Sequence, residues 1–87
     1  MANSKSAAKR ARQNEKRTDR NTAIRSQVKS AVRSFHEVLA SGDSEQAKAT
    51  LATATRLIRK AKSKGVIHSA TASRRVSRLA LAFNKKQ

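Results

Sequence analysis

The sequence IRSQVKSAVRSFHEVL, residues 24–39, determines the fold that we predict for the chain. Its apolar residues recur at steps of three and four, which is the spacing of one face of an α-helix. The stripe consists of Ile24, Val28, Ala31, Phe35 and Val38, with Val32 and Leu39 beside it. A helix with one apolar stripe has to bury it against other elements. The rest of the chain must therefore supply partners for this stripe.

The only two glycines, Gly42 and Gly65, divide the chain into three segments, and proline is absent. The segments are rich in Ala, Lys, Arg, Gln and Leu, which favour helix. We therefore predict three helices, over about 4–41, 44–64 and 70–86.

The predicted helix ends carry matching chemistry. Both glycines can adopt the left-handed backbone conformation that ends a helix, and Val66 would make the apolar contact of a Schellman turn. Asp43 suits the N-cap of the second helix, with Gln46 as its capping-box partner. Ser69 is the predicted N-cap of the third helix.

The second and third helices each have one apolar stripe as well. These stripes consist of Ala47, Leu51, Ala54, Ile58 and Ala61 in the second helix and of Ala72, Val76, Leu79 and Phe83 in the third. Three such helices joined by short turns favour an all-α fold, an antiparallel three-helix bundle, with the stripes as its core.

The first helix is longer than its apolar stripe. Followed backward, one line of core positions runs Val38, Ala31, Ile24, Arg17, Arg10, and the other runs Phe35, Val28, Asn21, Asn14, Ala7. Both lines change from mostly apolar to polar or small near residue 24. About 20 residues, or about 30 Å of helix, thus have no face to pack on the bundle. We predict a helical arm over 1–23, continuous with the first helix, and a bundle over 24–87.

The arm is strongly basic. Lys5, Lys9, Arg12, Lys16 and Arg20 share one face, and Arg10 and Arg17 lie to one side of it. An isolated, self-repelling helix of this length is marginal in water, so we expect it to fray in the free protein and to become ordered when phosphates bind it. The alternative is a disordered basic tail that only raises solubility. Because its helical register continues into the bundle, we favour the arm.

The whole chain carries 21 Lys and Arg against 5 Asp and Glu, a net charge of +16 in 87 residues. Residues 56–87 hold 10 basic residues and no acidic one. In the predicted bundle, Lys60, Lys62, Lys64, Arg74 and Arg75 gather at the Gly65 end, and Glu37, Asp43 and Glu45 at the Gly42 end. Such a one-sided excess indicates a polyanionic partner.

A membrane and a catalytic site are both disfavoured. There is no Trp or Tyr, and Phe35 and Phe83 are the only aromatic residues besides two histidines, so interfacial anchors are lacking. Cysteine is absent, which excludes disulfides and thiolate ligands, and the scattered acids predict no metal cluster or nucleophile–base pair. We expect a soluble cytoplasmic monomer that is not an enzyme and has no cofactor, metal or small-molecule substrate.

Reading single-stranded bases usually requires aromatic platforms, which this chain lacks. Recognition is therefore expected to be of backbone and shape, through Arg and Lys side chains. That fits folded RNA, where phosphates of several helices converge. A histone-like architectural protein that binds DNA is the alternative.

Two motifs resemble one family. The opening MANSKSAAKRARQNEKR, residues 1–17, resembles the N-terminal motif of the bacterial ribosomal protein S20 family, and KGVIH at 64–68 with ASRRVSRL at 72–79 resembles its second signature. The sequence departs from the family pattern at Ser4 and over 69–71. The resemblance implies a three-helix bundle that binds 16S ribosomal RNA directly, early in the assembly of the small ribosomal subunit, with a long first helix along the RNA.

The resemblance also implies a set of RNA-binding residues. From the first motif these are Lys5, Ser6, Lys9, Arg10, Arg12, Gln13, Lys16, Arg17, Arg20 and Asn21, and from the second Lys64, His68, Arg74, Arg75 and Arg78. Arg25 and Lys60, basic residues of the first and second helices, complete the predicted set. His68 lies in the predicted turn, where it suits either a phosphate or 2′-hydroxyl contact or packing of the turn.

Overall fold

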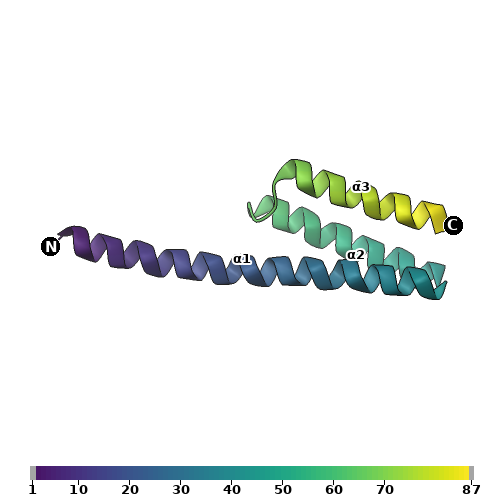
Figure 1. Cartoon of the computed structure of the whole chain (residues 1–87), viewed down its shortest axis with the longest axis horizontal. Helices are drawn as coiled ribbons and strands as arrows, with labels where there is room; N and C mark the ends of the chain where they lie inside the picture. Colours follow the sequence, from purple (N-terminus) through teal and green to yellow (C-terminus); the bar gives the residue numbers. More distant parts are fainter. Residues whose placement is uncertain (1, 87) are drawn as a thin grey trace.

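Residues 2–86 form three α-helices joined by two short connections (Figure 1). The structure, a computed structural model, describes the backbone of residues 2–86 and the side chains of residues 6–85. Helix α1 spans Ala2–Ser41, α2 spans Ser44–Ser63 and α3 spans Ser69–Lys86. Residues 2–86 contain no strand, so the predicted all-α fold is confirmed and the predicted helix ends are correct within two residues.

Both glycines have the left-handed conformation predicted for them, with φ of +87° at Gly42 and +75° at Gly65. At the end of α2, the backbone N–H of Val66 donates to the carbonyl of Ala61 at 2.9 Å, and that of Gly65 donates to Lys62 at 3.0 Å. This pair of bonds is a Schellman turn. Val66 itself is buried, as its predicted apolar contact requires.

The two helix starts differ in how well the sequence predicted them. The Asp43 carboxylate accepts the Gln46 backbone N–H at 3.1 Å, so the N-cap of α2 is confirmed. At α3 the prediction that Ser69 is the N-cap is wrong, because Ser69 is already helical. The cap is His68, whose Nδ1 accepts the Ala70 N–H at 3.3 Å and whose carbonyl accepts the Ala72 N–H at 2.9 Å. The ring nitrogen reaches the position that a serine hydroxyl usually takes.

The core combines the predicted stripes. Phe35, Ile58 and Val28 are its largest fully buried side chains. The other buried apolar residues are Ile24, Leu39, Ala47, Ala54, Ala61, Val66, Ile67, Ala72 and Leu79. Leu39 is buried and Val38 only partly so, which reverses their predicted order. Val66 and Ile67 of the α2–α3 connection also enter the core and close its end.

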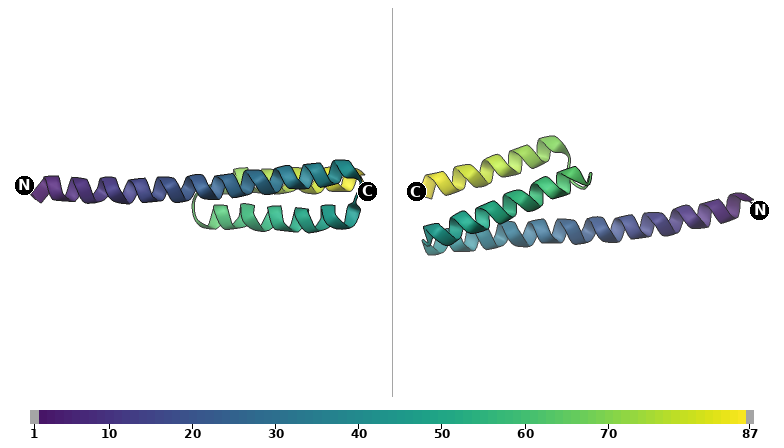
Figure 2. Two further views of the ribbon diagram at one scale, coloured as in Figure 1. Left: turned by 90° about the horizontal axis from the view of Figure 1, so that it is seen from below. Right: turned by 180° about the vertical axis from the view of Figure 1, so that it is seen from behind.

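Each helix runs antiparallel to the one before it. The described part of the molecule is elongated, with extents of 63 × 22 × 13 Å (Figure 2). Helix α2 packs along the C-terminal half of α1, and α3 packs on α2. Helix α3 touches α1 much less than it touches α2, so the bundle is open between α1 and α3.

The N-terminal half of α1 extends beyond the bundle (Figures 1 and 2). The α2–α3 connection lies beside the middle of α1, at the end of the bundle from which this half projects. From here on, we use the name arm for residues 2–20, the part of the predicted arm (1–23) that precedes the half-buried Asn21. Burial of α1 begins just after the arm, with the half-buried Asn21 and the buried Ile24.

Candidate nucleic-acid interface

The arm is a helix without tertiary support. Every side chain from residue 6 to residue 20 is exposed. Six of these fifteen residues are basic, namely Lys9, Arg10, Arg12, Lys16, Arg17 and Arg20. Lys5 also belongs to the predicted set, but its side chain lies outside the described residues. Because no neighbouring helix shields these cations, they are open to any anion that approaches the arm.

The basic residues occupy one side of the arm. At 100° per residue, Arg10 and Arg17 continue the line of Ile24 and the core, and the other basic residues follow on one flank. Lys9, Arg12, Gln13 and Lys16 surround a shallow hollow together with Ala8. The opposite side carries no Lys or Arg between residues 6 and 22, but Ala7, Ala11, Glu15, Thr18 and Thr22. The arm therefore presents a cationic side and a neutral to acidic side.

Asn21 differs from the other predicted contact residues. It stands at the junction of arm and bundle, where it is only partly exposed. Its side-chain oxygen Oδ1 is buried and has no hydrogen-bond partner. A buried, unsatisfied carbonyl oxygen is costly. Asn21 is consequently a junction residue whose Oδ1 is shielded from solvent, and its contact with RNA stays a prediction.

The α2–α3 connection brings together the basic end of the bundle. Lys60, Lys64 and His68 are exposed there. Because Nδ1 of His68 accepts the Ala70 N–H, a neutral His68 carries its proton on Nε2, at the other side of the ring. One nitrogen of His68 therefore caps α3 and the other remains a donor, and its contact with a phosphate or 2′-hydroxyl stays a prediction.

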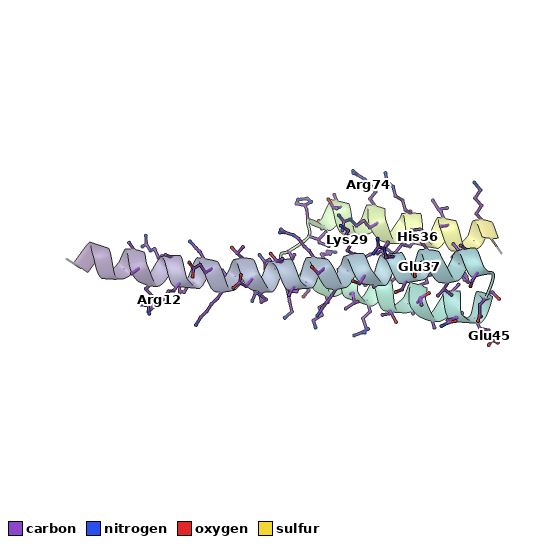
Figure 3. The ribbon with its side chains drawn as sticks, turned by 60° about the horizontal axis from the view of Figure 1, so that its bottom comes forward. Arg12, Lys29, His36, Glu37, Glu45 and Arg74 are labelled. Atoms are coloured by element: carbon purple, nitrogen blue, oxygen red, sulfur yellow. The ribbon has the colours of Figure 1, made fainter. Side chains whose placement is uncertain are left out.

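A groove of about 470 Å³ separates α1 from α3. Val28, Val32 and Leu79 form its apolar floor. The polar residues that line it are Arg25, Lys29 and His36 from α1 and Arg75 and Arg78 from α3. Figure 3 shows Lys29 and His36 on the side of α1 that faces α3. Three predicted residues, Arg25, Arg75 and Arg78, are thus brought to one place by two helices.

Arg74 does not join them. It is exposed and does not line the groove, and in Figure 3 it points away from α1. Arg74 and Arg75 are adjacent in sequence but therefore lie on two different surfaces of α3. At the opposite end of the bundle Asp43 and Glu45 are exposed, which makes that tip the acidic one.

The geometry offers no support for a metal centre or a membrane span. Among the described residues, no three His, Asp or Glu side chains are placed to hold a metal ion. None of the described helices combines the length and the apolar character that a bilayer crossing requires.

Comparison with known proteins identifies the family. The family model described as Ribosomal protein S20 matches residues 2–84. The chain belongs to the ribosomal protein S20 family. A small ribosomal subunit protein bS20 from Alkaliphilus oremlandii is 51% identical over 85 residues, covering 98% of both chains. The bS20 proteins of Pelotomaculum thermopropionicum and Nocardia farcinica are 49% and 48% identical, again over 98% of this chain and at least 97% of their own.

Membership of the S20 family makes this chain a structural ribosomal protein rather than an enzyme. The match runs through both the arm and the bundle, so the family pattern includes the residues that form the overhanging helix in this chain. The resemblance that the two sequence motifs suggested is confirmed.

The predicted RNA-binding set does not include three basic residues that line grooves in this structure. Lys29 lines the α1–α3 groove. Arg59 and Lys62 line a shallower one between α2 and α3, beside Ser73 and Ser77. The sequence shows that all three are charged. The spacing of residues along a helix does not tell whether a cation lines a groove or lies on a solvated face. Only the relative position of the helices makes that distinction.

Proposed function

We propose that the chain binds 16S ribosomal RNA directly, through phosphate and shape contacts, and helps to assemble the small ribosomal subunit. The observation that carries the proposal is the arm, a helix with every described side chain exposed and its cations on one side. A helix so placed gains nothing from the protein core. RNA phosphates would supply the partners that the core does not.

Electrostatics supports a polyanion as the partner. The net charge of +16 destabilises the free, compact protein by self-repulsion, and neutralisation by phosphates removes that cost. Each Lys or Arg that pairs with a phosphate also releases condensed counterions. Arginine is suited to this task because its planar guanidinium binds phosphate with two parallel hydrogen bonds.

The relatives favour RNA over DNA. They are named as proteins of the small ribosomal subunit, a particle in which the abundant polyanion is ribosomal RNA. The chain would act there as one copy, in the cytoplasm. A single copy is supported by the small core, which Val66 and Ile67 close, and by the lack of a second apolar stripe among the described residues.

The proposed contact residues form three groups. The arm contributes Lys5, Ser6, Lys9, Arg10, Arg12, Gln13, Lys16, Arg17 and Arg20, with Asn21 at its base. The connection between α2 and α3 contributes Lys60, Lys64 and His68. The bundle surface contributes Arg25, Arg74, Arg75 and Arg78. Phosphate contacts of this kind position a protein on RNA and do not read its sequence.

Filter binding to a 16S ribosomal RNA fragment, with duplex DNA as competitor and across a salt series, tests the proposal. If six or more phosphates are contacted, affinity should fall by about 10³-fold or more between 50 and 200 mM salt. The RNA should also be retained against excess DNA. Equal affinity for duplex DNA would favour the architectural DNA-binding alternative, and a slope equivalent to one or two contacts would contradict the charged-surface mechanism.

A further inference from the structure

The groove between α1 and α3 has a composition that phosphate binding alone does not explain. Its rim holds four cations, Arg25, Lys29, Arg75 and Arg78, and no carboxylate lines it. Its floor is apolar, formed by Val28, Val32 and Leu79. Phosphate groups gain nothing from an apolar floor, because they are better solvated at an open surface. A ligand that suits both parts has an anionic rim and a flat, weakly polar centre.

A nucleotide has that construction. Its base presents two apolar faces, and its neighbouring phosphates carry the charge. The volume of about 470 Å³ falls in the range of about 300–1,000 Å³ typical of small-ligand sites. Among the described residues no Phe, Tyr or Trp lines this groove, but histidine rings and arginine guanidinium planes also stack on exposed RNA bases. Arg75 and Arg78 line the α3 wall, so one guanidinium can stack on the base while the other rim cations bind the phosphates.

The position of the groove connects it with the arm. Arg25 lies four residues, about one helical turn, after the junction residue Asn21. The groove therefore begins about one helical turn from the base of the arm, on the flank of α1 that Thr18 and Thr22 continue, and the cationic side of the arm lies on the other flank. An acidic amphipathic helix would also match the charge of the rim. RNA is the better match because the groove lies about one helical turn from the proposed RNA-binding arm and because the relatives are proteins of the small ribosomal subunit.

We propose that the α1–α3 groove holds one unpaired nucleotide of the bound RNA, with its base on Val32 and Leu79 and its flanking phosphates on the cationic rim. His36 at the edge of the groove is placed to donate to, or accept from, the base edge. This inference rests on the proposed function. It adds a contact that depends on an unpaired base, whereas the arm binds backbone.

Site-directed crosslinking tests the inference, because the chain contains no cysteine and a single introduced thiol is unique. His36→Cys places a short photo-crosslinker at the groove, and Ala8→Cys places one beside Lys9 and Arg12 on the arm. Both full-length variants are irradiated with 16S ribosomal RNA, and crosslinked nucleotides are mapped by reverse transcription. The groove position should mark one unpaired nucleotide, and the arm position should mark helical backbone.

The two positions separate the two claims. If the arm crosslinks to RNA but the groove position marks only paired nucleotides or no RNA at all, the groove inference is overturned and the proposed function stands. A groove that instead captures an acidic protein helix would give that same result with purified RNA. If neither position crosslinks, direct RNA binding itself is wrong.

A charge-matched pair of variants then tests the apolar floor. Val32→Lys puts an ammonium group into the groove, and Ser30→Lys adds the same charge at an exposed site outside it. Simple electrostatics predicts that both variants bind RNA more tightly. Loss of a stacked base predicts instead that Val32→Lys weakens binding about tenfold relative to Ser30→Lys. Equal affinity of the two folded variants, checked by circular dichroism, would overturn the inference.

Discussion

The two halves of α1 are one continuous helix, yet different interactions hold them. From Ile24 to Leu39 the helix buries a stripe against α2, with Phe35 fully enclosed. From residue 6 to residue 20 every side chain is exposed, and propensity alone must maintain the helix. Most helical stability in proteins comes from packing of an apolar face rather than from propensity. Two parts of one continuous helix can therefore differ in stability. A binding partner can order the arm, whereas the bundle is held by its own core.

The largest expected contrast between the halves is in amide exchange of the free protein. Amides of Lys9 to Arg20 should exchange fast, because local fraying exposes them. Those of Phe35, Leu51 and Leu79 should open only with the bundle, so their exchange should be slower by about 10³-fold or more. Exchange measured by NMR on the RNA-free monomer checks this. Protection of the arm equal to that of the core would show that the two halves are held alike.

Replacement of Phe35 with Ala should destabilise the bundle by about 3–5 kcal/mol, through loss of apolar burial and the cavity that remains. The side chain is completely buried, so every contact is lost. Chemical denaturation followed by circular dichroism measures the effect, and added RNA should restore part of the fold by mass action. Leu81→Ala is the matched control, because Leu81 is 65% exposed and its loss should cost about 0.5 kcal/mol or less.

Replacement of Arg10 and Arg17 together with Ala should have the opposite profile. Neither side chain has a buried partner to lose, and Ala is the better helix former, so thermal stability should hardly change. RNA affinity should fall at least about tenfold, since a charge-assisted phosphate contact contributes roughly 1.5–3 kcal/mol.

The control for the arginine pair is Arg33→Ala with Arg56→Ala. Both residues are exposed and outside the proposed contact set, so the control removes the same charge from the bundle. A similar loss of affinity in both double variants would mean that only net charge matters. A lowered melting temperature in the arm variant would mean that the arm belongs to the core.

The smallest effect is expected at the α2–α3 connection. Gly65 has φ of +75°, and a Cβ atom built there meets no atom within 4 Å. Gly65→Ala should therefore cost only the backbone penalty, about 1–2 kcal/mol in the free energy of unfolding. Asn tolerates this conformation better, so Gly65→Asn should cost less, and thermal melts of the two variants check the order. RNA affinity of the folded protein should remain close to that of the original chain. An equal loss in both variants would point to a lost contact rather than to backbone conformation.

Much of the fold could be predicted because its signals are local. The glycines at 42 and 65 and the cap at Asp43 act within a single helical turn, and the structure confirms them. The prediction for Ser69 failed because a histidine ring also reaches the capping position. The relative burial of Val38 and Leu39 depends on where α2 crosses α1, which the spacing of residues does not specify. The basic arm was evident from the sequence, but its contacts with RNA stay predictions.

By itself, the sequence determined three helices, their stripes and the excess of positive charge at one end, because periodicity and charge belong to each helix separately. Only the tertiary structure decided which side of the α1–α2 pair receives α3. The sequence shows Val32 and Leu39 beside the α1 stripe, but their spacing does not specify which of the other two helices covers them. The choice puts Arg75 and Arg78 opposite Arg25 and Lys29 across an open groove, while it leaves Arg74 on the outside. A groove forms between two helices, so its lining depends on their relative position and cannot be read from the sequence of either helix alone.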